Sequence, residues 1–480
     1  MRDYQTFKTL FLSRTQVVYF VTLSKKAAHD FVFSCFLIKF ASSSSISEMN
    51  IRTYLLISTL ALSLCSVRAQ KLAGGDISML PRYEQAGATY YTHDGQSISD
   101  LIAYSKQVGM NAMRVRLFVN PKQQTTNSSA PYTWSADDNV CQDLAWVKAL
   151  GKRIKDAGMK LMLDIHYSDT WADPAKQWTP EAWKDLDDAA LAEKVYSYTS
   201  DALKQLKDAG AEPDLVQTGN EISYGMLWGR PDGSLQQCWP SSTANWDRFA
   251  NLLKQATKAV RETCPSAKII LHVERVSISQ QNDNKEYKAL TNFFSKMNTY
   301  AIDYDVIGLS YYPYFHGALS ELDGAITKLE AGWPNKEIMV VETGYPYAWA
   351  VPGTTYEDTK TWPYSDEGQK LFTDDLIAML NKHSKVDGLF WWWPEYNAKT
   401  NSASLSNWYN APLFDSRTGR ATSAFTALAK YATSSTAISQ LSVNTSKTTD
   451  DSYYDLSGRS VSQPKGSGVY IHHQKKIIVR

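Results

Sequence analysis

Residues 144–171, LAWVKALGKRIKDAGMKLMLDIHYSDTW, contain one complete unit of the pattern that decides the fold. Apolar residues recur with a helical period over residues 144–157. Ala157-Gly158 then suits a helix C-cap, where glycine adopts a left-handed conformation at little cost. The apolar run 160–165 has the length of a buried strand, and polar residues follow it directly. This stretch predicts a helix, a tight turn and a buried strand in succession.

The same alternation extends over most of the chain. Short apolar or β-branched runs predict eight strands, at Ala73–Ile77, Ala112–Phe118, Lys160–Ile165, Leu215–Gln217, Lys268–His272, Val306–Ser310, Glu337–Val341 and Gly388–Trp392. Stretches with helical period predict eight helices, at Ile98–Val108, Leu144–Ala157, Ala189–Ala209, Trp246–Thr263, Lys285–Tyr300, Gly317–Ala331, Asp366–His383 and Ser423–Tyr431. This order predicts an α/β fold, a (β/α)8 TIM barrel with enlarged βα loops. An open doubly wound sheet would need a Gly-rich phosphate loop, which Gly74-Gly75-Asp76 does not supply.

The N-terminal 69 residues have the pattern of a leader. Arg52 precedes the apolar run Tyr54–Leu64, which has signal-peptide length and is too short to span a bilayer. Val67-Arg68-Ala69 then places small residues at the −3 and −1 positions of a cleavage site. We therefore expect residues 1–48 to be a mis-called upstream extension and residues 49–69 to be a signal peptide.

The leader predicts a secreted or cell-surface protein. In an exported protein the cysteines can form disulfides, so their number is informative. Leu62-Ser63-Leu64-Cys65 resembles a lipoprotein box, although Leu64 stands where a small residue is wanted, so lipidation remains an alternative. Cys141, Cys238 and Cys264 follow the leader, and an odd count excludes a full disulfide framework. We expect one bridge at most, preferably Cys141–Cys238, because both residues follow strand ends.

The mature chain divides by composition into three parts. Residues 70–432 hold the alternating pattern and are the expected catalytic domain. Residues 433–452 are rich in Ser, Thr and Ala and are typical of a linker. Residues 453–480 contain two or three short strands and a basic end, and they are too few to form a core alone. This tail resembles the C-terminal sorting signal of exported hydrolases of the outer membrane; the alternative is a small β appendage without a targeting role.

Charge and aromatic content narrow the class of partner. The 50 Lys and Arg balance 49 Asp and Glu, and a net charge of +1 argues against binding nucleic acid or an anionic membrane surface. Trp and Tyr are numerous, at 15 and 28 residues. Such side chains fill cores, and they also stack on the apolar faces of sugar rings. The sequence has no coiled-coil heptad, so we expect a monomer.

Two glutamates stand where a barrel of this class builds its site, at the carboxyl ends of the strands. Glu221 follows the fourth predicted strand and Glu342 the seventh, and these strands lie across the lumen from each other. Glycoside hydrolysis needs one carboxyl group to protonate the leaving oxygen and another to attack the sugar or activate water. No Cys/His pair or acid triplet at the strand ends is typical of a metal cage, so no metal or cofactor is expected.

Six motifs resemble, in order, those of glycoside hydrolase family 53, the endo-β-1,4-galactanases of clan A. They are GGDISMLPRYEQAG, AMRVRLFVNP, DIHYSDTWADPAKQ, DLVQTGNEISYGMLW, DVIGLSYYPYF and VVETGYP, which lie between Gly74 and Tyr345-Pro346. The resemblance extends from about Gly74 to Thr426. It implies a (β/α)8 barrel, a retaining mechanism and a polysaccharide substrate, the β-1,4-galactan of arabinogalactan type I in pectin.

The resemblance also implies a role for individual residues. Glu221 would be the acid/base and Glu342 the nucleophile. Asn220 would bind the hydroxyl next to the anomeric carbon, Arg116 would keep the nucleophile charged, and Tyr311 would donate a hydrogen bond to it. The remaining substrate-binding candidates are the sugar platform Trp392, the rim residue Trp171 and the scaffold residue His166.

Three departures from the family pattern affect specificity. Trp393 stands where the family often has a Glu, and residues 346–365 lack the ligand spacing of the calcium loop of some bacterial members. HVERVSIS, residues 272–279, replaces a Gly- and aromatic-bearing segment, and its Glu274 is expected to point to solvent. The alternatives are therefore another clan A endo-glycanase, such as a mannanase or β-glucanase, or a catalytically silent glycan-binding barrel.

Overall fold

The structure is a computed structural model. It describes residues 70–125, 135–229, 234–238, 243–276, 285–397 and 411–434, and four short strands between residues 453 and 479. The predicted extension and signal peptide, and the linker after residue 434, lie outside these residues. Among the helices described, none is long and apolar enough to cross a membrane.

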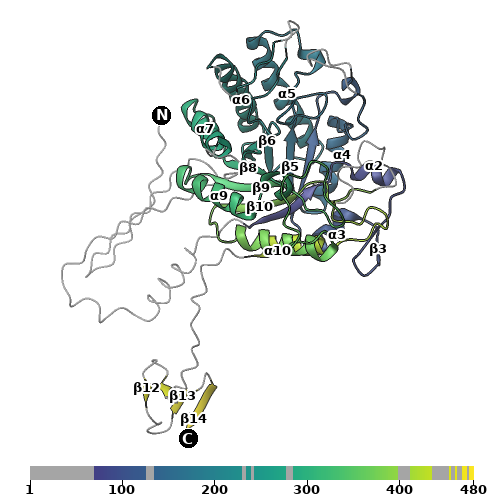
Figure 1. The fold of residues 1–480 in the computed structure, drawn as a ribbon. Coiled ribbons are helices and arrows are strands. Elements are labelled where there is room, and N and C mark those ends of the chain that lie inside the picture. Colours follow the sequence, from purple (N-terminus) through teal and green to yellow (C-terminus); the bar gives the residue numbers. More distant parts are fainter. Residues whose placement is uncertain are drawn as a thin grey trace, which may run out of the picture. The chain divides into compact units, whose positions relative to one another are not determined.

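Eight parallel strands close into a barrel, as the alternating pattern predicts (Figure 1). The order around the barrel is β1-β10-β9-β8-β7-β6-β5-β4, and β1 closes the ring against β4. The strands are β1 (Leu72–Asp76), β4 (Ala112–Leu117), β5 (Lys160–Ile165), β6 (Leu215–Thr218), β7 (Lys268–Val273), β8 (Val306–Tyr311), β9 (Glu337–Thr343) and β10 (Val386–Trp391). The predicted (β/α)8 fold is therefore confirmed.

Helices follow the strands and cover the outside of the barrel (Figure 1). The longer ones are α3 (Leu101–Gln107), α4 (Leu144–Asp156), α5 (Asp188–Asp208), α6 (Thr243–Thr263), α7 (Lys285–Thr299), α9 (Leu319–Gly332), α10 (Asp366–Leu380) and α11 (Ser423–Thr433). Shorter elements are α2 (Leu80–Gln85), α8 (Pro313–His316) and the β2–β3 pair (Tyr90–Tyr91 and Ser97–Ile98). The first long helix starts later than predicted because the Asp100 carboxylate accepts the N–H groups of Ile102 and Ala103 and caps it.

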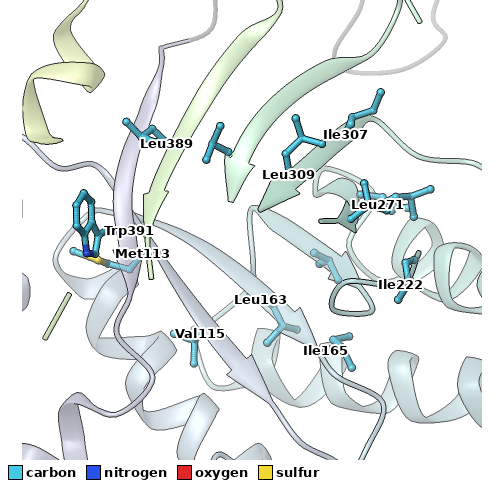
Figure 2. Close-up of a cluster of buried hydrophobic side chains, with 14 of the residues drawn as sticks. Met113, Val115, Leu163, Ile165, Ile222, Leu271, Ile307, Leu309, Leu389 and Trp391 are labelled. Carbon is cyan, nitrogen blue, oxygen red and sulfur yellow. The ribbon is translucent and has the colours of Figure 1, made fainter. Parts of the chain in front are cut away.

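Alternation along each strand separates two layers of side chains. Met113 and Val115 of β4 belong to a large apolar cluster, part of which is drawn in Figure 2. Leu117 and residues of the surrounding helices belong to the same cluster. Ala112 lies on the opposite face of β4, in a second cluster that takes residues from seven barrel strands. Because successive side chains of a strand point to opposite faces, residues 114 and 116 share the lumen side with Ala112. This alternation brings two arginines into the barrel.

The C-terminal tail forms a sheet of its own. Strands β11 (Tyr453–Asp455), β12 (Ser460–Val461), β13 (Gly468–His472) and β14 (Lys475–Val479) pair antiparallel in the order β12-β11-β13-β14. The tail is β-rich as predicted, with four strands rather than two or three.

The predicted Cys141–Cys238 disulfide is wrong. Cys141, Cys238 and Cys264 are all free thiols. Cys141 Sγ lies 3.9 Å from the sulfur of Met79, whereas Cys238 Sγ donates a hydrogen bond to the carbonyl of Asn245. Both cysteines do follow strand ends, but they are packed among different neighbours, and sequence position alone does not bring two thiols to bonding distance.

A substitution at Gly74 tests how tightly the barrel closes between β1 and β4. It pairs with Ala112 where β1 meets β4, and a Cβ atom built on it would lie 1.8 Å from the Ala112 carbonyl oxygen. We expect Gly74→Ala to lower the free energy of unfolding by about 3 kcal/mol or more, the upper range for overpacking a core. Gly332→Ala is the matched control because its Cβ meets nothing within 4 Å. Chemical denaturation of both variants is the measurement, and equal stabilities would contradict this account of closure.

Candidate active site

Arg114 lies at the centre of the candidate site. Its guanidinium is fully buried and donates hydrogen bonds to Asp76 Oδ2 at 3.0 Å and Asp164 Oδ2 at 2.8 Å. The same group donates to the amide oxygens of Gln217 at 3.0 Å and Asn220 at 2.9 Å. A buried charge is stable only where partners replace its lost hydration. One cation therefore ties together strands β1, β4, β5 and β6 and the segment after β6.

Glu342 is the third carboxylate at this cation. Its Oε1 lies 2.8 Å from Arg114 Nη2 and forms an ion pair with it. This oxygen accepts no hydrogen bond from Nη2, because the hydrogens of Nη2 point to Asp164 and Asn220. The hydroxyl of Tyr312 donates to the other oxygen, Oε2, at 2.8 Å. Burial raises the pKa of Glu342 to about 7, while Arg114 and the Tyr312 hydrogen bond oppose that rise. These two contacts favour the ionised form of Glu342.

Glu221 reaches the site through a strained turn. Strand β6 ends at Thr218, and Glu221 then adopts a left-handed backbone with φ 47°, which is uncommon for a residue with a side chain. The turn is held by a hydrogen bond from the Gln177 side chain to the Asn220 carbonyl at 2.7 Å. Ser310 Oγ lies 2.7 Å from Glu221 Oε1. Backbone strain at this position is consistent with a side chain that must be aimed for function.

The environment of Glu221 favours its protonated form. Burial, followed by the negative charges of Glu342 and Glu274, raises the pKa of Glu221 well above its usual value. Glu274 does not point to solvent as predicted, because its side chain is only 11% exposed and pairs with Arg275 at 2.9 Å. Its Oε2 also accepts the Ser223 hydroxyl at 2.7 Å. Burial therefore raises the pKa of both carboxyl groups, but Arg114 and Tyr312 oppose that rise at Glu342, so the proton is held more firmly on Glu221.

The two predicted glutamates come together as the barrel geometry requires. One carboxylate oxygen of Glu221, one of Glu342 and a ring nitrogen of His272 all lie within 4.8 Å of one another. Carboxyl groups about 5–5.5 Å apart are typical of retaining glycosidases, and those of inverting enzymes lie roughly 6.5–9.5 Å apart. An oxygen-to-oxygen distance of at most 4.8 Å fits the shorter of these two separations, the one in which a carboxylate attacks the sugar directly.

The same three residues do not fit a metal site. Both ring nitrogens of His272 are already in hydrogen bonds, at 2.8 Å to Ser310 Oγ and 2.9 Å to Asn220 Oδ1. Glu342 is engaged by a cation and a phenol. A metal ion bound there would have to break these contacts and lie beside the Arg114 charge, so the donor set fits proton transfer better than ligation.

The expected role of Arg116 at the nucleophile is wrong, because Arg114 takes that place. Arg116 pairs with Asp76 Oδ1 at 2.9 Å, and its guanidinium lies 4.7–5.4 Å from the ring centres of Trp171, Trp392 and Trp393. Both arginines share one face of β4, so the motif alone does not say which one reaches Glu342.

The predicted hydrogen bond from Tyr311 to Glu342 is also wrong, for a similar reason. It is the last residue of β8, lies on the helix-facing side, and donates its hydroxyl to the Gly317 carbonyl at 2.9 Å. Its neighbour Tyr312 points the other way and supplies the hydrogen bond to Glu342. A shift of one residue along an extended chain exchanges the two faces.

The other predicted substrate-binding residues lie around this centre. Asn220 donates its amide N–H to the Ala172 carbonyl at 2.8 Å. His166 acts as a scaffold, with Nε2 3.0 Å from Asp164 Oδ2 and Nδ1 accepting the Ala172 N–H at 3.0 Å. Trp171 and Trp392 meet edge to face with ring centres 6.0 Å apart. Trp392 is 9% exposed, so its indole is more enclosed than the predicted sugar platform requires.

Residues without a predicted role complete the site. Asp164 and Gln217 interrupt apolar strand runs, and both are fully buried partners of Arg114. His272 and Ser310 are fully buried beside Glu221. Their signal in the sequence is a polar residue inside an otherwise apolar strand, which a buried position tolerates only with a partner.

Comparison with known proteins agrees with this geometry. The family model of glycosyl hydrolase family 53 matches residues 72–428. The chain belongs to glycosyl hydrolase family 53. It is 34% identical over 344 residues to an arabinogalactan endo-β-1,4-galactanase of Thermothelomyces thermophilus, covering 70% of this chain and 93% of the relative. The endo-β-1,4-galactanase of Bacillus subtilis is 31% identical, covering 68% of this chain and 70% of the relative.

Solved structures of this family have the same fold. The family 53 catalytic domain of Ignisphaera aggregans superposes with a TM-score of 0.62 at 31% identity, covering 76% of this chain and 97% of that one. A fungal β-1,4-galactanase superposes with a TM-score of 0.61 at 30% identity, covering 75% and 99%. This family 53 chain is therefore a glycoside hydrolase built on a (β/α)8 barrel.

Lysine variants of the two arginines give a matched test of what holds Glu342 ionised. Lysine keeps the positive charge but lacks the planar set of N–H donors with which a guanidinium binds several acceptors at once. Arg114→Lys should therefore stabilise the ionised form of Glu342 less than arginine does. The pKa of Glu342 would rise in this variant. The acidic limb of the kcat/KM profile should therefore move up by about one pH unit, the low end of the pKa shifts that a nearby cation causes. Arg116→Lys should leave that limb in place and mainly raise KM. An equal shift in both variants would contradict the assignment.

Proposed function

We propose that the protein is a secreted, retaining endo-β-1,4-galactanase. The observation that carries the proposal is the asymmetry of the pair. Glu342 is held beside Arg114 and Tyr312, whereas no cation pairs with Glu221 among the residues that the structure describes. One carboxyl group is prepared to attack and the other to donate a proton, across a gap suited to double displacement.

The first step cleaves the glycosidic bond. Glu342 Oε2 or Oε1 attacks the anomeric carbon, and Glu221 gives its proton to the leaving glycosidic oxygen. The products are a covalent galactosyl ester on Glu342 and a shortened chain with a new hydroxyl. Tyr312 and Arg114 stabilise the carboxylate before attack.

In the second step, ionised Glu221 removes a proton from water, and the water oxygen attacks the same anomeric carbon. The ester bond to Glu342 breaks, the sugar leaves with its original configuration, and Glu221 regains its proton. Both carboxyl groups therefore return to their starting states.

The identity of the sugar rests on resemblance and on the walls of the site. The curated relatives are named arabinogalactan endo-β-1,4-galactanases. Trp171, Trp392 and Trp393 surround the Arg116 guanidinium and provide aromatic surface of the kind that stacks on the apolar face of a hexose. The relatives support galactan, and the aromatic walls support a hexose polymer without distinguishing its sugar.

Incubation with purified galactan, mannan, xylan and mixed-linkage β-glucan, followed by product sizing, tests the substrate. We expect galactan alone to be cut, into a ladder of internal fragments. Cleavage of mannan or β-glucan in preference to galactan would show that the proposed substrate is wrong, while the proposed reaction, glycoside hydrolysis, would stand. Binding of galactan without any product would support a silent glycan-binding barrel.

Two variants with added azide test the mechanism. Glu342→Ala should abolish hydrolysis, and azide should yield a glycosyl azide of inverted configuration. Glu221→Ala should lower kcat/KM on galactan far more than on an aryl galactobioside, whose leaving group needs little protonation, and azide should yield a product of retained configuration. NMR of the first-formed anomer in the unmodified enzyme is the control, and initial inversion would exclude double displacement.

We also propose export. The signal-peptide pattern of residues 49–69 supports cleavage before Gln70, with residues 70–432 as the catalytic domain. The β-rich tail at residues 453–480 supports a sorting role after the linker 433–452.

A further inference from the structure

A chain of hydrogen bonds extends from Glu221 into the barrel wall. Ser310 Oγ lies 2.7 Å from Glu221 Oε1 and 2.8 Å from His272 Nε2. His272 Nδ1 lies 2.9 Å from Asn220 Oδ1. The three side chains come from β8, β7 and the segment after β6, and Ser310 and His272 are fully buried. No step of the mechanism above uses Ser310 or His272.

The surroundings of Asn220 fix where its oxygen lies. The Asn220 amide nitrogen donates to the Ala172 carbonyl at 2.8 Å, and its oxygen accepts from Arg114 Nη2 at 2.9 Å. An oxygen 2.9 Å from His272 Nδ1 would repel a bare nitrogen lone pair, so this contact requires a hydrogen on Nδ1. The competing donors at Nδ1 are longer, at 3.1 Å for Gln217 Nε2 and 3.4 Å for the Glu221 N–H.

The tautomer of His272 then limits what Ser310 can do. Burial and the Arg114 charge keep the pKa of His272 well below its usual value, so the ring carries one hydrogen. With that hydrogen on Nδ1, Nε2 is an acceptor and needs the Ser310 hydroxyl hydrogen. Ser310 has only one hydrogen, and an ionised Glu221 would compete for it. A protonated Glu221 removes the conflict, because it donates to Ser310 Oγ instead.

We propose that Ser310 is a positioning residue whose hydroxyl hydrogen alternates between His272 and Glu221 during each catalytic cycle. Before cleavage, the Glu221 O–H donates to Ser310 and the Ser310 O–H donates to His272 Nε2. When Glu221 gives its proton to the leaving oxygen, the Ser310 hydrogen turns to the new carboxylate. When Glu221 takes a proton from water, that hydrogen returns to His272. The His272 proton stays on Nδ1 throughout, so no charge leaves the site by this route.

Other charged groups around Glu221 act in addition to this chain. They are Glu342 of β9, Glu274 after β7, Asp173 after β5, Tyr312 after β8 and, at His272, Arg114 of β4, Asp164 of β5 and His166 after β5. A test must therefore separate the Ser310 route from direct electrostatic effects of His272. A double-mutant cycle does so, because removing Ser310 breaks the route and leaves the other groups in place.

The cycle compares His272→Leu in the wild-type and Ser310→Ala backgrounds. Without Nε2, the Ser310 hydrogen is free to pair with the Glu221 carboxylate, which stabilises the ionised form. The pKa of Glu221 should fall, and the alkaline limb of kcat/KM should move down by about one pH unit, the shift expected from one hydrogen bond to a charge. In the Ser310→Ala background, His272→Leu should leave that limb unmoved. An equal shift in both backgrounds, or no shift in a folded His272→Leu enzyme, would overturn the proposal.

A second readout keeps the proposal testable if His272→Leu does not fold. Ser310→Ala alone should lower kcat/KM on galactan about tenfold, the rate equivalent of one hydrogen bond. On an aryl galactobioside, kcat/KM should stay near wild type because that bond breaks with little acid assistance. Equal loss on both substrates would overturn the proposal. Ser105→Ala is the control for deleting a buried hydroxyl. Within the part of the chain that the structure describes, Ser105 Oγ donates a hydrogen bond to the Leu101 carbonyl in α3 and to no other group.

This inference rests on the proposed acid role of Glu221, and the two can fail separately. If Glu221→Ala kept wild-type activity on galactan, the proposed function would fail. If Glu221→Ala were impaired while the cycle was additive, only the Ser310 route would fail.

Discussion

The site depends on one constraint, the need of the buried Arg114 guanidinium for partners that replace its lost hydration. Arg114 has three carboxylates and two amide oxygens within 3.0 Å. Such a group is stable in a barrel lumen only if every strand around it supplies its partner. Glu342, the proposed nucleophile, is one of those partners, so the cation that joins the polar side chains of the barrel lumen also favours the ionised form of this carboxyl group.

The asymmetry between the two glutamates follows from that arrangement. Glu342 shares the Arg114 cation, whereas Glu221 faces Glu342 and Glu274 and has a serine as its hydrogen-bond partner. Two carboxyl groups this close cannot both ionise easily, and the proton resides on the one without the cation. Arg114 also fixes Asn220, which fixes His272 and through it Ser310. One buried charge thereby influences both members of the proposed catalytic pair.

The fold and the meeting of the two glutamates were predictable because both depend on patterns that can be read along the sequence. Apolar runs located the eight strands, and strand ends located Glu221 and Glu342. The choice between Arg114 and Arg116, and between Tyr311 and Tyr312, depends on depth and face within a strand, and adjacent candidates of the same type are not separated by the motif. The His272–Ser310 contact depends on how β7 and β8 pair, with His272 beside Gly308, and only the structure gives that register. The Cys141–Cys238 pairing failed because a sequence does not give distances between loops.

The protonation states of the two glutamates are the most direct test of this account. Carbon-13 NMR of the wild-type enzyme labelled at the glutamate carboxyl carbons would follow both groups, with each signal assigned by its loss in Glu221→Gln or Glu342→Gln. Between the two titration steps, we expect the chemical shift of an ionised carboxylate for Glu342 and that of a protonated acid for Glu221. The reverse assignment, with Glu221 ionised first beside a protonated Glu342, would contradict the central role given to Arg114.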